Sequence, residues 1–166
     1  TRERILNADA TTVSVGYYEG GVYNNYWVLI FSYPENSHTE DYRQEVLNLV
    51  NAQRARYGLT ALEMGDDALT AAAQTRAEEI SVVNSHVRPD GSKCFTVLKD
   101  YGITDTPTGE NAAWGSVSPE EVVNAWMNSE GHRANILNPE ARKMSVGYYY
   151  NSNSTWGHQW IQIFTK

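Results

Sequence analysis

The four histidines and several glutamates are the side chains of this sequence best suited to chemistry. The histidines are His38, His86, His132 and His158, and the spacing alone does not select a glutamate that would act with them. Neutral imidazoles with one or two carboxylates form a ligand set that suits zinc. A carboxylate that is hydrogen-bonded to an imidazole would instead orient it as a metal-free polar centre. The residue types alone leave both interpretations open.

No nucleophile can be nominated from the sequence. HExxH, GxSxG, P-loop and CxxC motifs are all missing. Ser85 adjoins His86, and residues adjacent in sequence seldom share the required hydrogen-bond geometry. The single cysteine, Cys94, cannot form an internal disulfide, and neither a histidine nor a second cysteine lies close to it in sequence. We therefore interpret Cys94 as a small apolar filler.

Length and charge narrow the class of protein. The 166 residues provide for one ordinary domain with an appendage, and the net charge is −7 without a basic run. Nucleic acid is therefore excluded as a partner. The longest apolar stretch, residues 26–31, is far shorter than the roughly 20 residues that span a bilayer. The first residues resemble the interior of a longer polypeptide, so we expect a mature or trimmed piece.

The beginning of the chain repeats its end. Ten of 17 aligned positions are identical between residues 2–18, RERILNADATTVSVGYY, and residues 133–149, RANILNPEARKMSVGYY. After a two-residue shift the repeat continues, and Trp27 aligns with Trp160. Residues 1–33 are therefore either the remnant of a preceding similar domain or an added hairpin, in a monomer or a hairpin-swapped dimer. The repeat has Thr1 where the C-terminal copy has His132, so it carries no histidine site.

Periodicity and turn signals predict the remaining elements. A linker at 34–38 precedes the main domain, and a buried stripe on the helix at 66–83 contains residues 69, 72, 73, 76, 77 and 80. We assign Trp114, Trp126, Trp156 and Trp160 to the core, and the run 148–150 must alternate between faces. The other expected elements are helices at 39–57, 94–101 and from 119, a turn at 132–137, and strands at 109–115, 144–150 and 156–164.

An ordered series of phrases across residues 39–166 resembles the bacterial CAP domains, relatives of cysteine-rich secretory proteins, antigen five and plant pathogenesis-related proteins. The phrases are EVLNLVNAQRARYGLTAL, SHVRPDG, GENAAWG, AWMNSEGHRANILNP, VGYYY and WIQIF. The resemblance implies an α+β fold, a three-layer α-β-α sandwich with a small antiparallel sheet. The repeat adds an N-terminal hairpin-like segment to it.

The resemblance also implies a cleft that can hold a divalent metal, commonly zinc. The matching residues are His86 and Glu110, with His132 from the GHR phrase, and these three are the implied metal ligands. His158 lies one residue away from the position that eukaryotic members use. The resemblance does not decide which residue is the second acid of the cleft. Ser129 stands at the position where eukaryotic members have a glutamate, and Glu130 follows it. Asn111 belongs to the same cleft, where we expect it to satisfy backbone groups.

We predict an extracellular, secreted or cell-surface domain, from a Gram-positive bacterium. Its His/Glu cleft would bind a divalent metal and a small-molecule, peptide or lipid-like ligand, or a cell-wall component. The prediction leans away from an enzyme. One alternative is a zinc-dependent hydrolase of peptide or cell-wall substrates, with Glu110 as ligand or general base. The other is an adhesion or scaffold module in which the cleft is idle.

Overall fold

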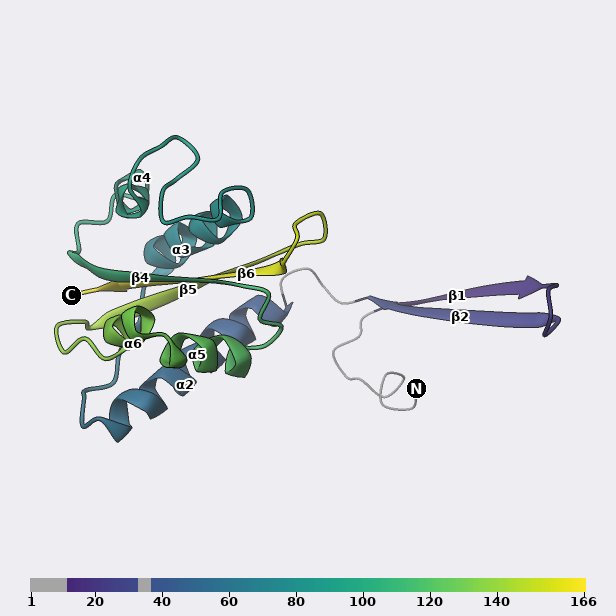
Figure 1. Ribbon diagram of the computed structural model, residues 1–166, viewed down its shortest axis with the longest axis horizontal. Coiled ribbons are helices and arrows are strands. Elements are labelled where there is room, and N and C mark those ends of the chain that lie inside the picture. The colour runs from purple at the N-terminus through teal and green to yellow at the C-terminus, as the bar shows by residue number, and fades with distance from the viewer. Residues whose placement is uncertain (1–11, 33–36) are drawn as a thin grey trace. The chain divides into compact units, whose positions relative to one another are not determined.

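The computed structural model describes residues 12–32 and 37–166, which fall into two compact units (Figure 1). The units are residues 1–40 and 41–166, and each is described by itself. Residues 34–36 of the predicted linker lie outside the described residues, whereas Ser37 and His38 are the first residues of a helix, so the linker prediction was wrong at these two positions. The assignment of residues 1–33 to a preceding repeat stays a prediction.

A two-stranded antiparallel hairpin makes up the described part of the first unit. It consists of β1 (Thr12–Glu19) and β2 (Asn25–Ser32). Tyr17 pairs with Trp27, and their ring centroids are 4.6 Å apart. The turn is closed by the Gly20 amide, which donates to the Asn24 carbonyl at 2.6 Å. The predicted N-terminal hairpin is thereby confirmed.

A four-stranded sheet forms the centre of the second unit, in the order β3-β5-β6-β4. Only the two-residue β3 runs parallel to its neighbour, and the other pairs are antiparallel. In the central hairpin Tyr148 pairs with Trp160. The strands are β3 (Glu63–Met64), β4 (Pro107–Trp114), β5 (Lys143–Asn151) and β6 (Gly157–Thr165).

Helices cover both faces of this sheet, which confirms the predicted three-layer sandwich (Figure 1). Trp160 and Phe164 of β6 face the first helical layer, whereas Ile161 and Ile163 face the second, as strand alternation requires. The first layer is α2 (Ser37–Arg56), α5 (Pro119–Asn128) and α6 (Glu130–Ile136). The second is α3 (Asp67–Ile80), the 3₁₀ turn η1 (Cys94–Thr96) and α4 (Val97–Asp100).

Capping residues fix where the helices begin. The Asp66 side chain accepts a hydrogen bond from the Leu69 amide at the start of α3, and Ser118 accepts one from the Glu121 amide at the start of α5. The end of α3 differs from the prediction, because the helix stops at Ile80 rather than near residue 83. The end of α5 lies at Asn128 because Ser129 is extended and forms the N-cap of α6.

The helix α3 lies directly on the backbone of β5. A Cβ atom at Gly147 would overlap the carbonyl oxygen of Ala73, so no other residue fits there without moving the helix. All six residues of the predicted stripe on α3 are buried. Within the described part of the chain, no helix combines the length and apolar character needed to cross a membrane.

Candidate functional site

A buried carboxylate joins three elements around His86. Glu110 on β4 accepts from Arg76 on α3 through both oxygens, at 2.9 Å from Nε and 3.2 Å from Nη2. Its Oε1 also lies 2.8 Å from His86 Nδ1, in the loop after α3. The Glu110 side chain is 2% exposed and that of His86 is 54% exposed. The imidazole is therefore held from inside through Nδ1, while about half of its side chain is exposed.

The electrostatics keep Glu110 ionised and raise the pKa of His86. Burial alone would raise the pKa of the Glu110 carboxyl, but hydrogen bonds from His86 and Arg76 outweigh burial and hold it below its usual value. The bond to Glu110 raises the pKa of His86 against the opposing effects of burial and Arg76. With the carboxyl ionised, Nδ1 of His86 is the donor in this pair.

A chain of ion pairs ties Arg76 into the loop that carries His86. Arg76 Nη1 lies 2.6 Å from Glu79 Oε2, and Arg88 Nη2 lies 2.7 Å from Glu79 Oε1. Arg88 continues to Asp100 at 2.7 Å. Arg76 Nη2 also donates to the Ser85 carbonyl, next to His86. The loop position of His86 is thus held by charged groups from α3 and α4.

The second predicted histidine, His132, is placed by a buried amide. Asn111 Nδ2 donates to the His132 carbonyl at 3.1 Å and to Gln162 Oε1 at 3.0 Å. Asn135 of α6 in turn donates to Asn111 Oδ1 at 2.8 Å. Burial, together with the nearby charge of His86, lowers the pKa of His132. Asn111 therefore fixes α6, which carries His132, to β4.

The remaining predicted residues do not join this cluster. Ser129 is the residue before α6, and Glu130 is exposed at its first position. Among the described residues, no hydrogen bond or ion pair connects either of them to His86 or Glu110. His158 instead lies 2.8 Å from the Tyr148 hydroxyl on the neighbouring strand. The side chain of His38 lies outside the described residues.

Two residues of the site were not predicted from the sequence. Arg76 appeared only as a member of the buried stripe on α3. Cys94 is buried as expected, yet potential ligand atoms of Cys94, His86 and Glu110 all lie within 4.8 Å of one another. Burial raises the pKa of the Cys94 thiol to about 11, and Glu110 adds to the shift. The thiol is therefore protonated and weakly nucleophilic at neutral pH.

The fit of the donor set to a divalent metal depends on the role of Glu110. Both of its oxygens are engaged by Arg76, so direct coordination would break a buried ion pair. The contact with His86 Nδ1 matches the arrangement in which a carboxylate orients a metal-binding imidazole from behind. The donor set fits a metal bound at His86 with Glu110 as the orienting group, whereas His132 is not in the group of potential ligands whose atoms lie within 4.8 Å of one another among the described residues.

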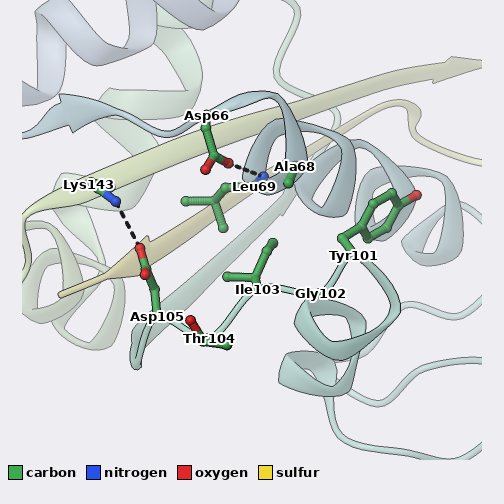
Figure 2. Close-up of a pocket in the computed structure, with 9 residues that line it drawn as sticks. All are labelled: Asp66, Ala68, Leu69, Tyr101, Gly102, Ile103, Thr104, Asp105 and Lys143. Carbon is green, nitrogen blue, oxygen red and sulfur yellow. Dashed lines mark hydrogen bonds and ion pairs between the residues drawn. The ribbon is translucent and has the colours of Figure 1, made fainter.

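Two cavities lie away from His86, Glu110 and His132. One of about 160 Å³ lies beside the start of α3, where Lys143 and Asp105 form an ion pair of 3.0 Å (Figure 2). The other, of about 320 Å³, is mostly apolar and borders η1 and α4. We place the candidate site at the buried Glu110 cluster, because its polar groups converge there and neither cavity contains a comparable set.

Comparison with known proteins identifies relatives. A family model described as CAP, the cysteine-rich secretory protein family, matches residues 47–164. YkwD of Bacillus subtilis is 42% identical over 122 residues, which is 72% of this chain and 47% of YkwD. The membrane protein YlbC of the same organism is 31% identical over 115 residues, 66% of this chain and 33% of YlbC. The chain thus spans about half or less of these relatives.

Solved structures of bacterial surface and extracellular proteins are similar in fold. An extracellular protein with an SCP domain from Bacillus anthracis has a TM-score of 0.68 and 24% identity, and the match covers 84% of this chain and 47% of that one. An outer surface protein of Borrelia burgdorferi has a TM-score of 0.61 and 25% identity, over 74% of this chain and 90% of that one.

Proposed function

This chain belongs to the cysteine-rich secretory protein family, in its bacterial branch, and we propose that it is an extracellular binding domain. Its His86–Glu110 site engages a divalent metal ion and a small, peptide or lipid-like ligand. The carrying observation is the geometry of His86, whose Nδ1 is held by a buried carboxylate while about half of the side chain is exposed. The extracellular location is supported by the surface and extracellular proteins that share the fold.

The residues of the site have separate roles in this proposal. Glu110, locked by Arg76, holds His86 in the tautomer with a proton on Nδ1, so that Nε2 offers a lone pair outward. His132 offers the second imidazole, and its lowered pKa keeps it neutral at physiological pH. A zinc ion held by these nitrogens would supply Lewis acidity toward an oxygen of the ligand. Asn111 keeps α6, and with it His132, fixed to β4.

The test is a zinc titration by calorimetry on the metal-stripped chain. We expect a dissociation constant below about 10 µM, corresponding to more than about 7 kcal/mol of binding free energy. Binding should disappear in the His86→Ala/His132→Ala double variant. His158→Ala is the matched control, because it removes a partly buried histidine outside the site and should leave zinc binding unchanged. The proposal fails if the intact chain takes up no zinc or if the double variant binds equally well.

Two further variants identify the ligand set. Glu110→Gln should weaken zinc binding about 10- to 100-fold if Glu110 only orients His86. Since this change leaves Arg76 buried without its full partner, its folding must be checked first. Cys94→Ser should leave the affinity unchanged. A loss in Cys94→Ser would instead assign the metal to His86, Cys94 and Glu110.

The opposite pKa shifts of His86 and His132 favour one rival, a hydrolase that uses them as an acid and a base. NMR titration should find the pKa of His86 above 6.5 and that of His132 below it. The raised pKa of His86 also predicts how folding stability changes with pH. The His86 contribution is complete below about pH 6.5 and is lost as pH rises through its folded pKa. Turnover of a peptide or cell-wall substrate that His86→Ala abolishes would favour the hydrolase.

A further inference from the structure

An exposed aromatic surface lies at the open end of the β5–β6 hairpin, apart from the His86–Glu110 site. Trp156, assigned to the core from the sequence, is 53% exposed, so that assignment was wrong. Tyr150 is 56% exposed, as the alternation of the tyrosine run predicts for at least one ring. We refer to Tyr150, Trp156 and the residues between them as the hairpin-tip surface.

Each ring borders a glycine: Tyr150 lies beside Gly157 at the start of β6, and Trp156 lies beside Gly115, which follows β4. A Cβ atom at Gly157 would lie 3.2 Å from Tyr150 Cε2, and one at Gly115 would lie 3.5 Å from Trp156 Cε3. Gly157 and Gly115 have φ values of 68° and 84°, in the left-handed region. The glycines therefore let the two rings approach the backbone, and each ring keeps about half of its surface open.

The loop between the rings is held in one shape by its own polar groups. The Asn151 side chain accepts from the Asn153 amide at 2.9 Å. Ser154 Oγ accepts from the amides of Trp156 at 3.3 Å and Gly157 at 3.1 Å. Tyr150 packs on the ring of His158 at a centroid distance of 4.9 Å. A surface that is organised before binding loses less entropy when a ligand arrives.

The chemistry of this surface is neutral and rich in hydroxyl and amide groups. The run between the rings reads Asn151-Ser152-Asn153-Ser154-Thr155, and no Lys, Arg, Asp or Glu occurs from residue 144 to 165 in a chain of net charge −7. At this end of the sheet the Glu121 carboxylate acts on His158. Charged partners therefore gain little here, whereas a neutral molecule with many hydroxyls can form hydrogen bonds to several groups at once.

We infer that the hairpin-tip surface binds a neutral oligosaccharide. A pyranose ring has a face of C–H groups and a rim of hydroxyls. The C–H face packs on an aromatic ring through dispersion and burial of apolar surface, and the hydroxyls pair with the amide and hydroxyl side chains of the loop. The two open rings stand at the two ends of the loop 151–155, and each can pack on one sugar unit. The inference does not depend on the proposed metal site.

The test measures binding of the full chain to cellohexaose and to the hexamer of N-acetylglucosamine, by calorimetry and tryptophan fluorescence. We expect dissociation constants on the order of 0.1–1 mM for so small a contact area. Hexagalacturonate, an anionic chain of similar length, should bind more weakly because the protein is acidic.

Single substitutions decide the outcome. Trp156→Ala should weaken binding at least about tenfold, and Tyr150→Ala should weaken it less. Trp27→Ala and Tyr57→Ala are matched controls, because both remove exposed rings elsewhere in the chain. His86→Ala should bind the sugars normally, which separates this site from the proposed metal site. The inference is overturned if neither neutral hexamer binds, or if Trp27→Ala weakens binding as much as Trp156→Ala does.

Discussion

The hairpins β1–β2 and β5–β6 are two versions of one structure in different surroundings. Tyr17 pairs with Trp27 as Tyr148 pairs with Trp160, and the ring centroids lie 4.6 Å and 4.5 Å apart. The hydroxyl of Tyr17 donates to Asn25, the position that aligns with His158 in the second hairpin. The repeated sequence therefore has the same strand register and the same side-chain pairs in both hairpins.

The two hairpins differ in how far other elements bury them. Trp160 is fully buried and lies against the ring of Tyr42 from α2 at 5.5 Å, whereas Trp27 is 65% exposed. A Cβ atom at Gly147 would overlap the backbone of α3, whereas a Cβ atom at Gly16 would lie 3.9 Å from its nearest neighbour, in Val28. Register and cross-strand pairing are thus local properties of the two strands. The stability of the second hairpin comes from the helical layers, since an isolated two-stranded hairpin is marginal.

The largest expected difference concerns the paired tryptophans. Trp160→Ala should lower the free energy of unfolding of the second unit by about 3–5 kcal/mol, because it leaves a cavity and removes the donor to the Ser116 carbonyl. Trp27→Ala should change it by no more than about 0.5 kcal/mol. Denaturant unfolding followed by circular dichroism measures both. Equal effects would show that burial is not what separates the hairpins.

The aligned glycines give the next largest contrast. Gly147→Ala should cost about 2–3 kcal/mol, because the new methyl group pushes α3 away from β5. Gly16→Ala makes only ordinary van der Waals contact with Val28, so we expect it to leave the midpoint of thermal unfolding unchanged. A Gly147→Ala protein with the wild-type midpoint would mean that α3 adjusts without cost.

A smaller contrast is expected for the tyrosine hydroxyls. Tyr148→Phe removes a half-buried hydrogen bond to His158 and should cost about 1 kcal/mol. Tyr17→Phe removes the bond to Asn25, but water replaces it at an exposed site, so a change of only a few tenths is expected. The comparison of the two variants under the same denaturant conditions checks the role of burial. A larger loss for Tyr17→Phe would contradict it.

The smallest effect is a pH dependence that only the second hairpin has. Burial lowers the pKa of His158, with Glu121 opposing, so the folded state prefers the neutral ring. Its contribution to stability is present above about pH 6.5 and is lost as pH falls toward the folded pKa. His158→Asn copies Asn25 and should flatten the stability profile in this window. An identical slope in the variant and the wild type would exclude His158 as its source.

Sequence patterns predicted local features of the fold correctly but missed contacts between distant elements. Helical periodicity identified the buried face of α3 because burial repeats along the helix, and it placed Arg76 on that face. Periodicity does not reveal a partner on another strand, so the ion pair with Glu110 was missed. An arginine on an otherwise apolar stripe was the available signal, since a buried guanidinium requires an acid.

The cluster itself depends on contacts between distant segments. The nearness of His86 to Glu110 was implied by family resemblance and not by spacing, and the structure places their side chains 2.8 Å apart. Cys94 was judged by its sequence neighbours, which gave no hint that β4 passes beside it. Trp156 was assigned to the core because its residue type is usually buried, yet its place in the β5–β6 loop leaves it open.

The backbone contact between Ala73 and Gly147 fixes the distance between the sheet and the second helical layer. Arg76 follows Ala73 by less than one helical turn, so the depth at which its guanidinium meets Glu110 is measured from main chain to main chain. Because main-chain atoms set this distance, we expect substitutions of other core side chains to leave it unchanged. The position of His86 is therefore independent of most of the side chains in the core.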